Sequence, residues 1–219
     1  ALDLDSLVRQ VVFGSTEESH WARGVIRAAA REAGLGPASI RDFYTARARD
    51  EISGFTVPAF NLRILPYQHA RRIFRAAKRL NAGALIFELS RGEMAYSYQS
   101  PEEYGTQILA AALREGYPLP VFLQGDHYQV SAKAYAKDAD SEIRNLEFLI
   151  ERSLAAGFYN IDIDASTLVD LSKKTLAEQQ APNIEASSRL IRFVRQLELE
   201  GHPASLGGEI GEVGEKNSS

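Results

Sequence analysis

Residues 121–127 read Val-Phe-Leu-Gln-Gly-Asp-His, an apolar run that ends in an acid and a histidine. The run follows Pro120 and has the length and composition of a buried β-strand. Gly125 allows the backbone to turn, so Asp126 and His127 are expected to emerge at the carboxyl end of this strand. In parallel α/β folds that end is where functional sites are built. A neutral imidazole there can bind a divalent metal ion, and the neighbouring carboxylate can transfer protons.

Composition limits the classes of function. The chain has 219 residues, of which 45% are apolar and 25% charged, enough for one domain with a sizeable core. A net charge of −4 gives no electrostatic reason to expect nucleic acid or an acidic membrane surface as a partner. Cysteine is absent, so a metal site must use His, Asp or Glu. Since neither a membrane-spanning run nor a signal peptide is found, we expect a cytoplasmic protein with no membrane partner.

The order of expected elements indicates the fold class. Apolar residues at three- and four-residue spacing predict an N-terminal helical segment, residues 1–54, with helices over 4–13, 21–33 and 42–52. Strands and helices then alternate through residues 55–219. Strands are expected at 55–61, 84–90, 120–127, 160–166 and 204–211, and helices at 66–80, 101–115, 140–156 and 176–200. Four βα units followed by a fifth strand predict an α/β fold with a parallel sheet. This pattern alone fits both a doubly wound sheet and a (β/α)8 barrel.

Polar residues fall at the carboxyl end of every expected strand. They are Asn61; Glu88 and Ser90; Asp126 and His127; Asp162 and Asp164; and Glu209. Five strands that bring polar groups to one rim favour a (β/α)8 TIM barrel, of which this chain holds about the first five strands. No GxGxxG motif follows the first strand and no P-loop occurs, which weighs against nucleotide-binding folds.

Three groups on this rim are candidates for metal chemistry. His127 and Glu209 are the expected metal ligands, and Asp126 is the expected general acid or base. Asp162 and Asp164 alternate with isoleucines, so both point to one face of their strand. Two carboxylates that lie close together are costly unless a cation or hydrogen bonds satisfy them, so we expect at least one to be functional.

Four motifs resemble those of a known family. They are Val-Pro-Ala-Phe-Asn at 57–61, Gly-Asp-His at 125–127, Ala-Gly-Phe-Tyr-Asn-Ile-Asp-Ile-Asp-Ala-Ser at 156–166 and Gly-Glu-Ile-Gly-Glu-Val-Gly at 208–214. In order and spacing they resemble the class II (metal-dependent) ketose-bisphosphate aldolases, which include fructose- and tagatose-bisphosphate aldolases. The resemblance extends over about residues 55–217.

The resemblance implies roles for individual residues. Asp126 corresponds to the proton-transferring aspartate and His127 to a zinc-binding histidine of that family. Glu209 and Asp164 correspond to residues of the metal site, and Asn61 and Ser90 match positions that contact substrate.

The implied activity is metal-dependent aldol cleavage or condensation of a ketose (bis)phosphate such as fructose 1,6-bisphosphate, in glycolysis or related carbohydrate metabolism. Zn²⁺ is the expected metal, a small sugar phosphate the expected substrate and a homo-oligomer the expected assembly. The expected strands carry no lysine, which weighs against the Schiff-base class of aldolase.

The sequence also departs from that family. Gln124-Gly125 replaces the usual residues before Asp126, and residues 1–54 form a longer segment than many relatives carry, so we expect a divergent subgroup. Strands six to eight, which would supply two further metal-binding histidines and most phosphate-binding groups, are not found after the fifth strand. We therefore expect a fragment, or half of an assembly, that is inactive alone. Two alternatives stay open: a non-catalytic, aldolase-like barrel subunit that supports a catalytic partner, and another metal-dependent barrel lyase or isomerase.

Overall fold

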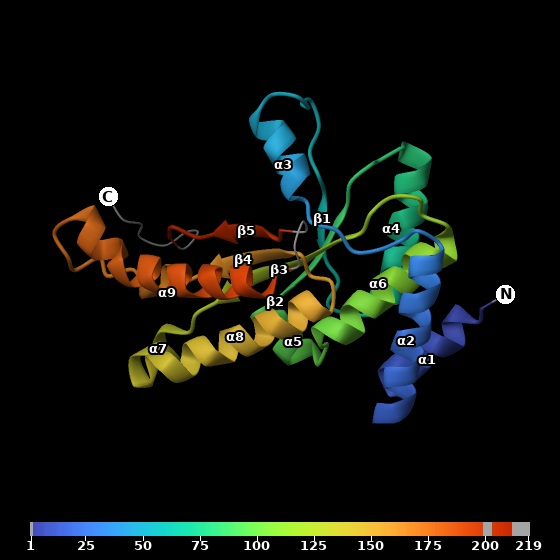
Figure 1. Ribbon diagram of the computed structural model, residues 1–219, viewed down its shortest axis with the longest axis horizontal. Coiled ribbons are helices and arrows are strands. Elements are labelled where there is room, and N and C mark those ends of the chain that lie inside the picture. The colour runs from blue at the N-terminus through green and yellow to red at the C-terminus, as the bar shows by residue number, and fades with distance from the viewer. Residues whose placement is uncertain (1, 199–202, 212–219) are drawn as a thin grey trace.

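The computed structural model describes residues 2–198 and 203–211. Three helices come first, and strands then alternate with helices (Figure 1). The first three elements are α1 (Leu4–Phe13), α2 (Thr16–Glu32) and α3 (Arg41–Ala48). The others are β1 (Ala59–Asn61), α4 (Pro66–Leu80), β2 (Ile86–Ser90), α5 (Arg91–Ser97), α6 (Pro101–Glu115), β3 (Phe122–Gln129), α7 (Ala132–Lys137), α8 (Ala139–Ala155), β4 (Asn160–Asp164), a 3₁₀ turn (Ser166–Leu168), α9 (Leu176–Leu197) and β5 (Ser205–Gly208).

The strands form one five-stranded sheet in the order β1-β2-β3-β4-β5, and every neighbouring pair is parallel. Each connection between consecutive strands contains at least one helix, as parallel pairing requires. The expected α/β fold with a parallel sheet is therefore confirmed.

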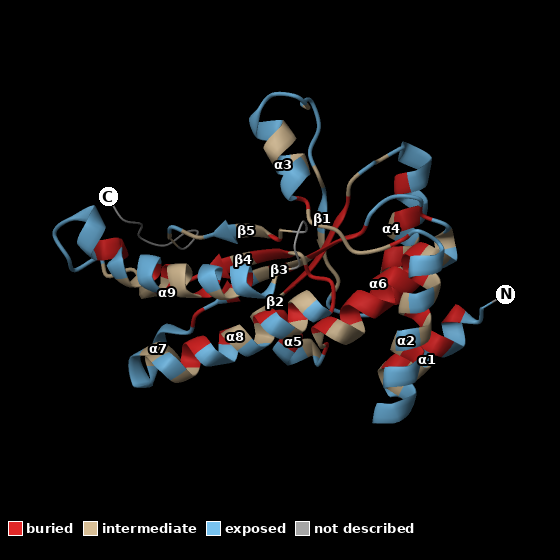
Figure 2. Ribbon diagram, in the orientation of Figure 1, coloured by how far each residue is buried: buried red, intermediate tan, exposed pale blue. Residues whose placement is uncertain are grey.

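One face of the sheet is apolar and covered by helices. We call it the helix-covered face; its residues are Phe60, Phe87, Leu89, Leu123, Tyr128, Ile161 and Ile163, which belong to or pack against the main core. The ring of Phe74 on α4 lies 5.0 Å from that of Phe87, and Tyr104 on α6 donates a hydrogen bond of 3.2 Å to the carbonyl of Glu88. Figure 2 shows α6 buried along most of its length, since α1, α2, α4 and α8 pack around it.

The opposite face is polar. Because side chains alternate along a strand and the register is sequential, this polar face consists of Asn61, Glu88, Gln124, Asp126, Asn160, Asp162 and Asp164. In Figure 1, α3 projects on the side of the strands opposite to α8 and α9. The part of this face at the amino-terminal ends of the strands is apolar. There Ile86 and Phe122 pack with Ile40 in a second, small core.

The segment between α2 and α3 crosses the amino-terminal ends of the strands. The amide of Ala38 donates to the carbonyl of Val121 (3.0 Å), and the amide of Ile40 donates to Oδ1 of Asn160 (2.7 Å). Asn160 is 1% exposed and also donates to the carbonyl of Leu123 (2.8 Å). Part of the N-terminal helical segment thus closes the sheet at the end away from the polar strand termini.

Several boundaries differ from those expected from the sequence. β1 and β5 are shorter than expected, with three and four residues. α2 begins at Thr16 because Ser15 and Glu18 form a capping box, and the short helices α5 and α7 were not predicted. α9 is described to Leu197; residues 199–200 of the predicted helix lie outside the described residues. No helix within the described part of the chain is both long and apolar enough to cross a membrane.

Candidate functional site

A β-bulge in β3 positions the two residues that the sequence singled out. Gly125 pairs with Ile161 and Tyr128 with Ile163, so Asp126 and His127 together lie opposite Asp162. A bulge bends the strand and redirects side chains, and His127 has the left-handed backbone angle φ = 44°. The turn expected at Gly125 therefore occurs at His127. As a result, two consecutive side chains both approach the polar face.

Gly125 has a different role from the one expected. A Cβ at this position would point toward the helix-covered face and would lie 2.4–2.8 Å from atoms of the Tyr128 side chain. Tyr128 is fully buried, and its hydroxyl lies 2.6 Å from Oγ of Ser153 on α8. Glycine at position 125 thus gives the tyrosine ring the space that the bulge requires.

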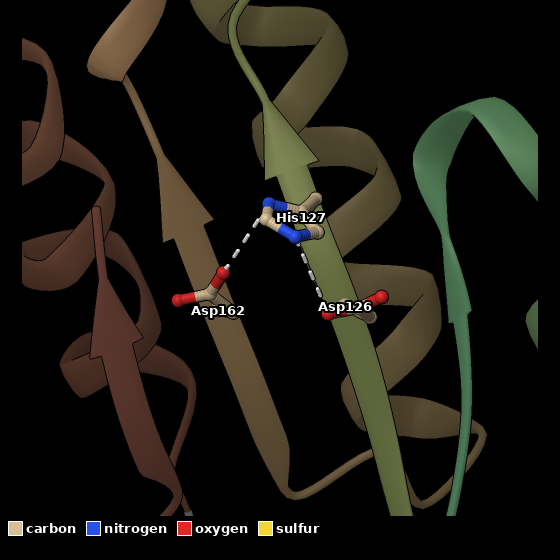
Figure 3. Close-up of side chains that lie close together, drawn as sticks. All are labelled: Asp126, His127 and Asp162. Atoms are coloured by element: carbon tan, nitrogen blue, oxygen red, sulfur yellow. Dashed lines mark ion pairs between the residues drawn. The ribbon is translucent and has the colours of Figure 1, made fainter. Parts of the chain in front are cut away.

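Asp126, His127 and Asp162 converge at the carboxyl end of the sheet (Figure 3). Each offers one potential metal-ligand atom, and these atoms lie within 4.8 Å of one another. Nε2 of His127 lies 3.9 Å from Oδ1 of Asp126, and Nδ1 lies 3.8 Å from Oδ2 of Asp162. Ligand atoms around one ion bound at about 2.0–2.2 Å are roughly 3–4 Å apart. One imidazole among carboxylates is a donor set that fits a divalent cation.

Asp164 makes hydrogen bonds through both oxygens and is 2% exposed. Oδ1 accepts from the amide and hydroxyl of Ser166 (3.0 and 2.6 Å), and Oδ2 accepts from Nε2 of Gln129 (2.8 Å). Nδ1 of His127 lies 3.2 Å from the same Oδ2. Burial alone would raise the pKa of Asp164, but the bonds from Ser166, Gln129 and His127 lower it below its usual value. Since an ionised carboxylate only accepts, Nδ1 of His127 carries the hydrogen and Nε2 is left to bind a cation.

Glu209 approaches the same imidazole from the end of β5. Its Oε1 lies 3.9 Å from Nδ1 of His127. The amide side chain of Asn183 on α9, itself 5% exposed, donates to the carbonyl of Glu209 (2.9 Å), and Gln180 donates to the carbonyl of Ile210 (2.9 Å). Helix α9 therefore holds the backbone from which this carboxylate extends.

The crowding of acids changes their affinity for protons. Burial, followed by the charge of Glu209, raises the pKa of Asp162 to about 6. Burial lowers the pKa of His127, but the bond to Asp164 and the charges of Asp126 and Asp162 more than offset it, so this pKa lies above its usual value. A carboxylate that holds its proton as strongly as Asp162 does is typical of sites that bind a cation or transfer protons.

The two predicted substrate-contacting residues lie beside Asp126. The side-chain amide of Asn61 donates to Oδ2 of Asp126 (3.3 Å) and to Oε2 of Glu93 (2.9 Å). Ser90 is the N-cap of α5, where its Oγ accepts from the amide of Glu93 (3.0 Å). The amide of Ser90 also donates to Oε2 of Glu93 (2.9 Å), so both residues are tied to the buried carboxylate of Glu93, a residue that sequence reasoning did not select.

Sequence reasoning did not distinguish Asp162 from Asp164. Asp162 has 18% of its side chain exposed and joins the three-residue cluster, whereas Asp164 was the expected ligand. The sequence feature that could have indicated Asp162 is Gly207, which pairs with Asp162 across β4 and β5. A Cβ at Gly207 would lie 2.6 Å from Oδ1 of Asp162, so the glycine leaves room for this carboxylate.

A cavity borders the described part of the chain elsewhere. It has a volume of about 840 Å³ and is bordered by Pro37, Tyr159, Leu197 and Ala204, at the amino-terminal ends of β4 and β5. It contains none of the clustered residues, so we place the candidate site at the opposite end of the strands.

Comparisons with known proteins support the fold alone. No protein-family model and no curated protein matches the sequence. Among solved structures, the chain is similar to the crystal structure of a probable tagatose 6 phosphate kinase from Sinorhizobium meliloti 1021, with 20% sequence identity and a TM-score of 0.51. The match covers 71% of this chain and 40% of that one, so the chain spans about two-fifths of the length of the solved structure.

Proposed function

We propose that the polar face forms part of a divalent-metal site for aldol cleavage and condensation of a phosphorylated ketose, as in the class II aldolases that the motifs resemble. The observation that carries this proposal is the convergence of Asp126, His127 and Asp162 at the carboxyl end of a parallel sheet. On this proposal the five described strands are the first five of a (β/α)8 barrel, whose site lies at that end. The similar solved structure is that of a probable tagatose 6 phosphate kinase, and tagatose 6-phosphate is a phosphorylated ketose.

The cation would be held by Nε2 of His127 together with a carboxylate oxygen of Asp162, and Glu209, whose Oε1 lies nearer to Nδ1, would add negative charge beside it. When bound there, a divalent ion such as Zn²⁺ supplies Lewis-acid polarisation of a ketose carbonyl. Asp164 keeps the imidazole in one orientation and one tautomer, because its Oδ2 accepts from Nδ1. We therefore reassign Asp164 from the expected ligand to a positioning residue.

Asp126 would transfer the proton. Its Oδ2 is held by Asn61 and its Oδ1 faces His127, so the carboxylate has a fixed place beside the cation site. In cleavage, Asp126 accepts the proton of the substrate hydroxyl, the adjacent carbon–carbon bond breaks, and its electron pair moves toward the ketose carbonyl. In condensation the same proton returns to the new hydroxyl.

One observation favours a second function. Within the described residues, the cluster contains one imidazole among several carboxylates. This composition also suits a non-catalytic, aldolase-like subunit that supports a catalytic partner.

The test is an assay of fructose 1,6-bisphosphate and tagatose 1,6-bisphosphate cleavage by the Zn²⁺-loaded protein that carries the complete barrel, with and without a chelator. Asp126→Asn is compared with Asp170→Asn, which removes a partly exposed acid outside the cluster. We expect activity that the chelator abolishes, that Asp126→Asn lowers by about 10²–10⁴-fold and that Asp170→Asn leaves unchanged. Metal binding without cleavage would support the non-catalytic subunit, and a protein that binds no metal would overturn both.

A further inference from the structure

An arginine is fixed at the edge of the candidate site. Arg63 follows β1, and its side chain is 56% exposed. Its Nε nevertheless donates a short hydrogen bond of 2.5 Å to Oε1 of Glu93, a side chain only 9% exposed. A bond to a buried carboxylate removes much of the rotational freedom that an exposed arginine normally keeps.

The backbone at Arg63 is fixed as well. The buried side chain of Gln99 donates to the carbonyl of Arg63 (2.9 Å) and contacts that of Leu62 (3.4 Å). Both the main chain and the guanidinium of this residue are thus held by groups from the α5 region. Such a double anchor is unusual for a surface loop whose only task is to connect β1 to α4.

The anchor is continuous with the candidate catalytic carboxylate. Oε2 of Glu93 accepts from the amide of Asn61 (2.9 Å), and the same amide contacts Oδ2 of Asp126 (3.3 Å). A chain of polar contacts therefore runs from the exposed Arg63 through Glu93 and Asn61 to Asp126. It connects the guanidinium, through two side chains, to the carboxylate proposed to transfer the proton.

We propose that Arg63 binds the phosphate of the substrate, an inference that rests on the proposed function. Only Nε is engaged with Glu93, whereas the two Nη groups make no hydrogen bond with any described residue. Two such amino groups match the oxygens of a phosphate. The neighbouring Arg91, by contrast, is engaged by both oxygens of Glu142 and by the carbonyl of Gln129.

The negative charge of the site explains why a positively charged side chain is needed at its edge. Asp126, Asp162, Asp164 and Glu209 surround the imidazole, so an anionic substrate would be repelled. A guanidinium held at the edge offsets this repulsion and selects phosphorylated over neutral sugars.

The experiment compares Arg63→Gln and Arg63→Lys with Arg72→Gln, which removes the same charge from an exposed position on α4. Calorimetry measures the binding of fructose 1,6-bisphosphate, of unphosphorylated fructose and of Zn²⁺, and circular dichroism establishes that each variant is folded. We expect bisphosphate binding to weaken roughly 10- to 100-fold in Arg63→Gln and less in Arg63→Lys. Zn²⁺ affinity should be unchanged in all three variants, and Arg72→Gln should bind as the wild type does.

The outcomes separate this inference from the proposed function. Equal bisphosphate affinity in Arg63→Gln and wild type, or no discrimination against unphosphorylated fructose by the wild type, would overturn the role of Arg63 while leaving the metal site in place. A wild type that binds no Zn²⁺ would overturn the proposed function, yet a loss of bisphosphate binding confined to the Arg63 variants would still support Arg63 as the anion-binding residue.

Discussion

The two faces of the sheet use the same five strands for different purposes. On the helix-covered face, Phe87, Leu123 and Ile163 are almost completely buried and pack against helices. On the polar face, the alternate positions gather carboxylates whose mutual repulsion opposes folding. Since side chains alternate along a strand, a single segment can stabilise the fold with one set of residues and bring reactive groups together with the other.

The faces meet at the bulge in β3. Tyr128 anchors the strand among the helices, and the residue just before it, His127, turns toward the acids. The comparison implies that substitutions on the helix-covered face change stability, that those on the polar face change cation binding, and that those at the bulge change both.

The largest effect on stability is expected from Phe87→Ala. Phe87 is fully buried between the rings of Phe74 and Phe60, at 5.0 and 5.9 Å, so truncation leaves a cavity and costs about 3–5 kcal/mol of unfolding free energy. Phe13→Ala removes an 82% exposed ring and should cost less than about 0.5 kcal/mol. Urea unfolding measures both. Zn²⁺ affinity of the folded Phe87→Ala protein should match that of the wild type; a large loss would mean that the two faces are not separable.

Gly125→Ala tests the connection between the faces. The new methyl group would meet the buried ring of Tyr128, so we expect a cost of about 1–3 kcal/mol and a displaced bulge. Because His127 lies in that bulge, Zn²⁺ affinity should fall as well. Adding Tyr128→Leu should recover part of the lost affinity in a double-mutant cycle. Unchanged affinity in Gly125→Ala alone would show that the bulge does not place the imidazole.

Of the three test substitutions, Asp162→Asn should have the smallest effect on stability, and in the opposite direction. Burial and Glu209 raise the pKa of Asp162 to about 6 in the folded protein, above the unfolded value of 3.8. Its protonated form therefore stabilises the metal-free fold below about pH 4, and this contribution is lost as the pH rises through 6. At pH 8 the asparagine variant should be more stable than the wild type by about 1–2 kcal/mol, although it binds Zn²⁺ more weakly.

Denaturant unfolding with a chelator, at pH 5 and pH 8, checks this prediction. The stability difference between Asp162→Asn and wild type should grow with pH, whereas Asp170→Asn, at a partly exposed site outside the cluster, should show no such growth. A variant that is less stable than the wild type at pH 8 would mean that the carboxylate is satisfied without a cation.

Alternation and apolar runs are enough to predict the parallel sheet and its helices, because burial leaves a strong periodic pattern in strands such as β3 and β4. β1 was overestimated, since only three of its residues pair. The candidate site was predicted in part: Asp126, His127 and Glu209 do approach one another, but a period of two could not separate Asp162 from Asp164. That distinction depends on Ser166 and Gln129, which engage one carboxylate and not the other. Arg63 was missed because its anchor, Glu93, lies 30 residues away in the chain.

The central claim is that the polar face binds a divalent cation through His127, and calorimetric titration with Zn²⁺ tests it most directly. We predict one ion per chain in the wild type, no measurable binding in His127→Gln, and a roughly 10- to 100-fold weaker affinity in Asp164→Asn, in which the imidazole loses its orienting partner. An absence of binding in the wild type, or equal affinity in His127→Gln, would contradict the account.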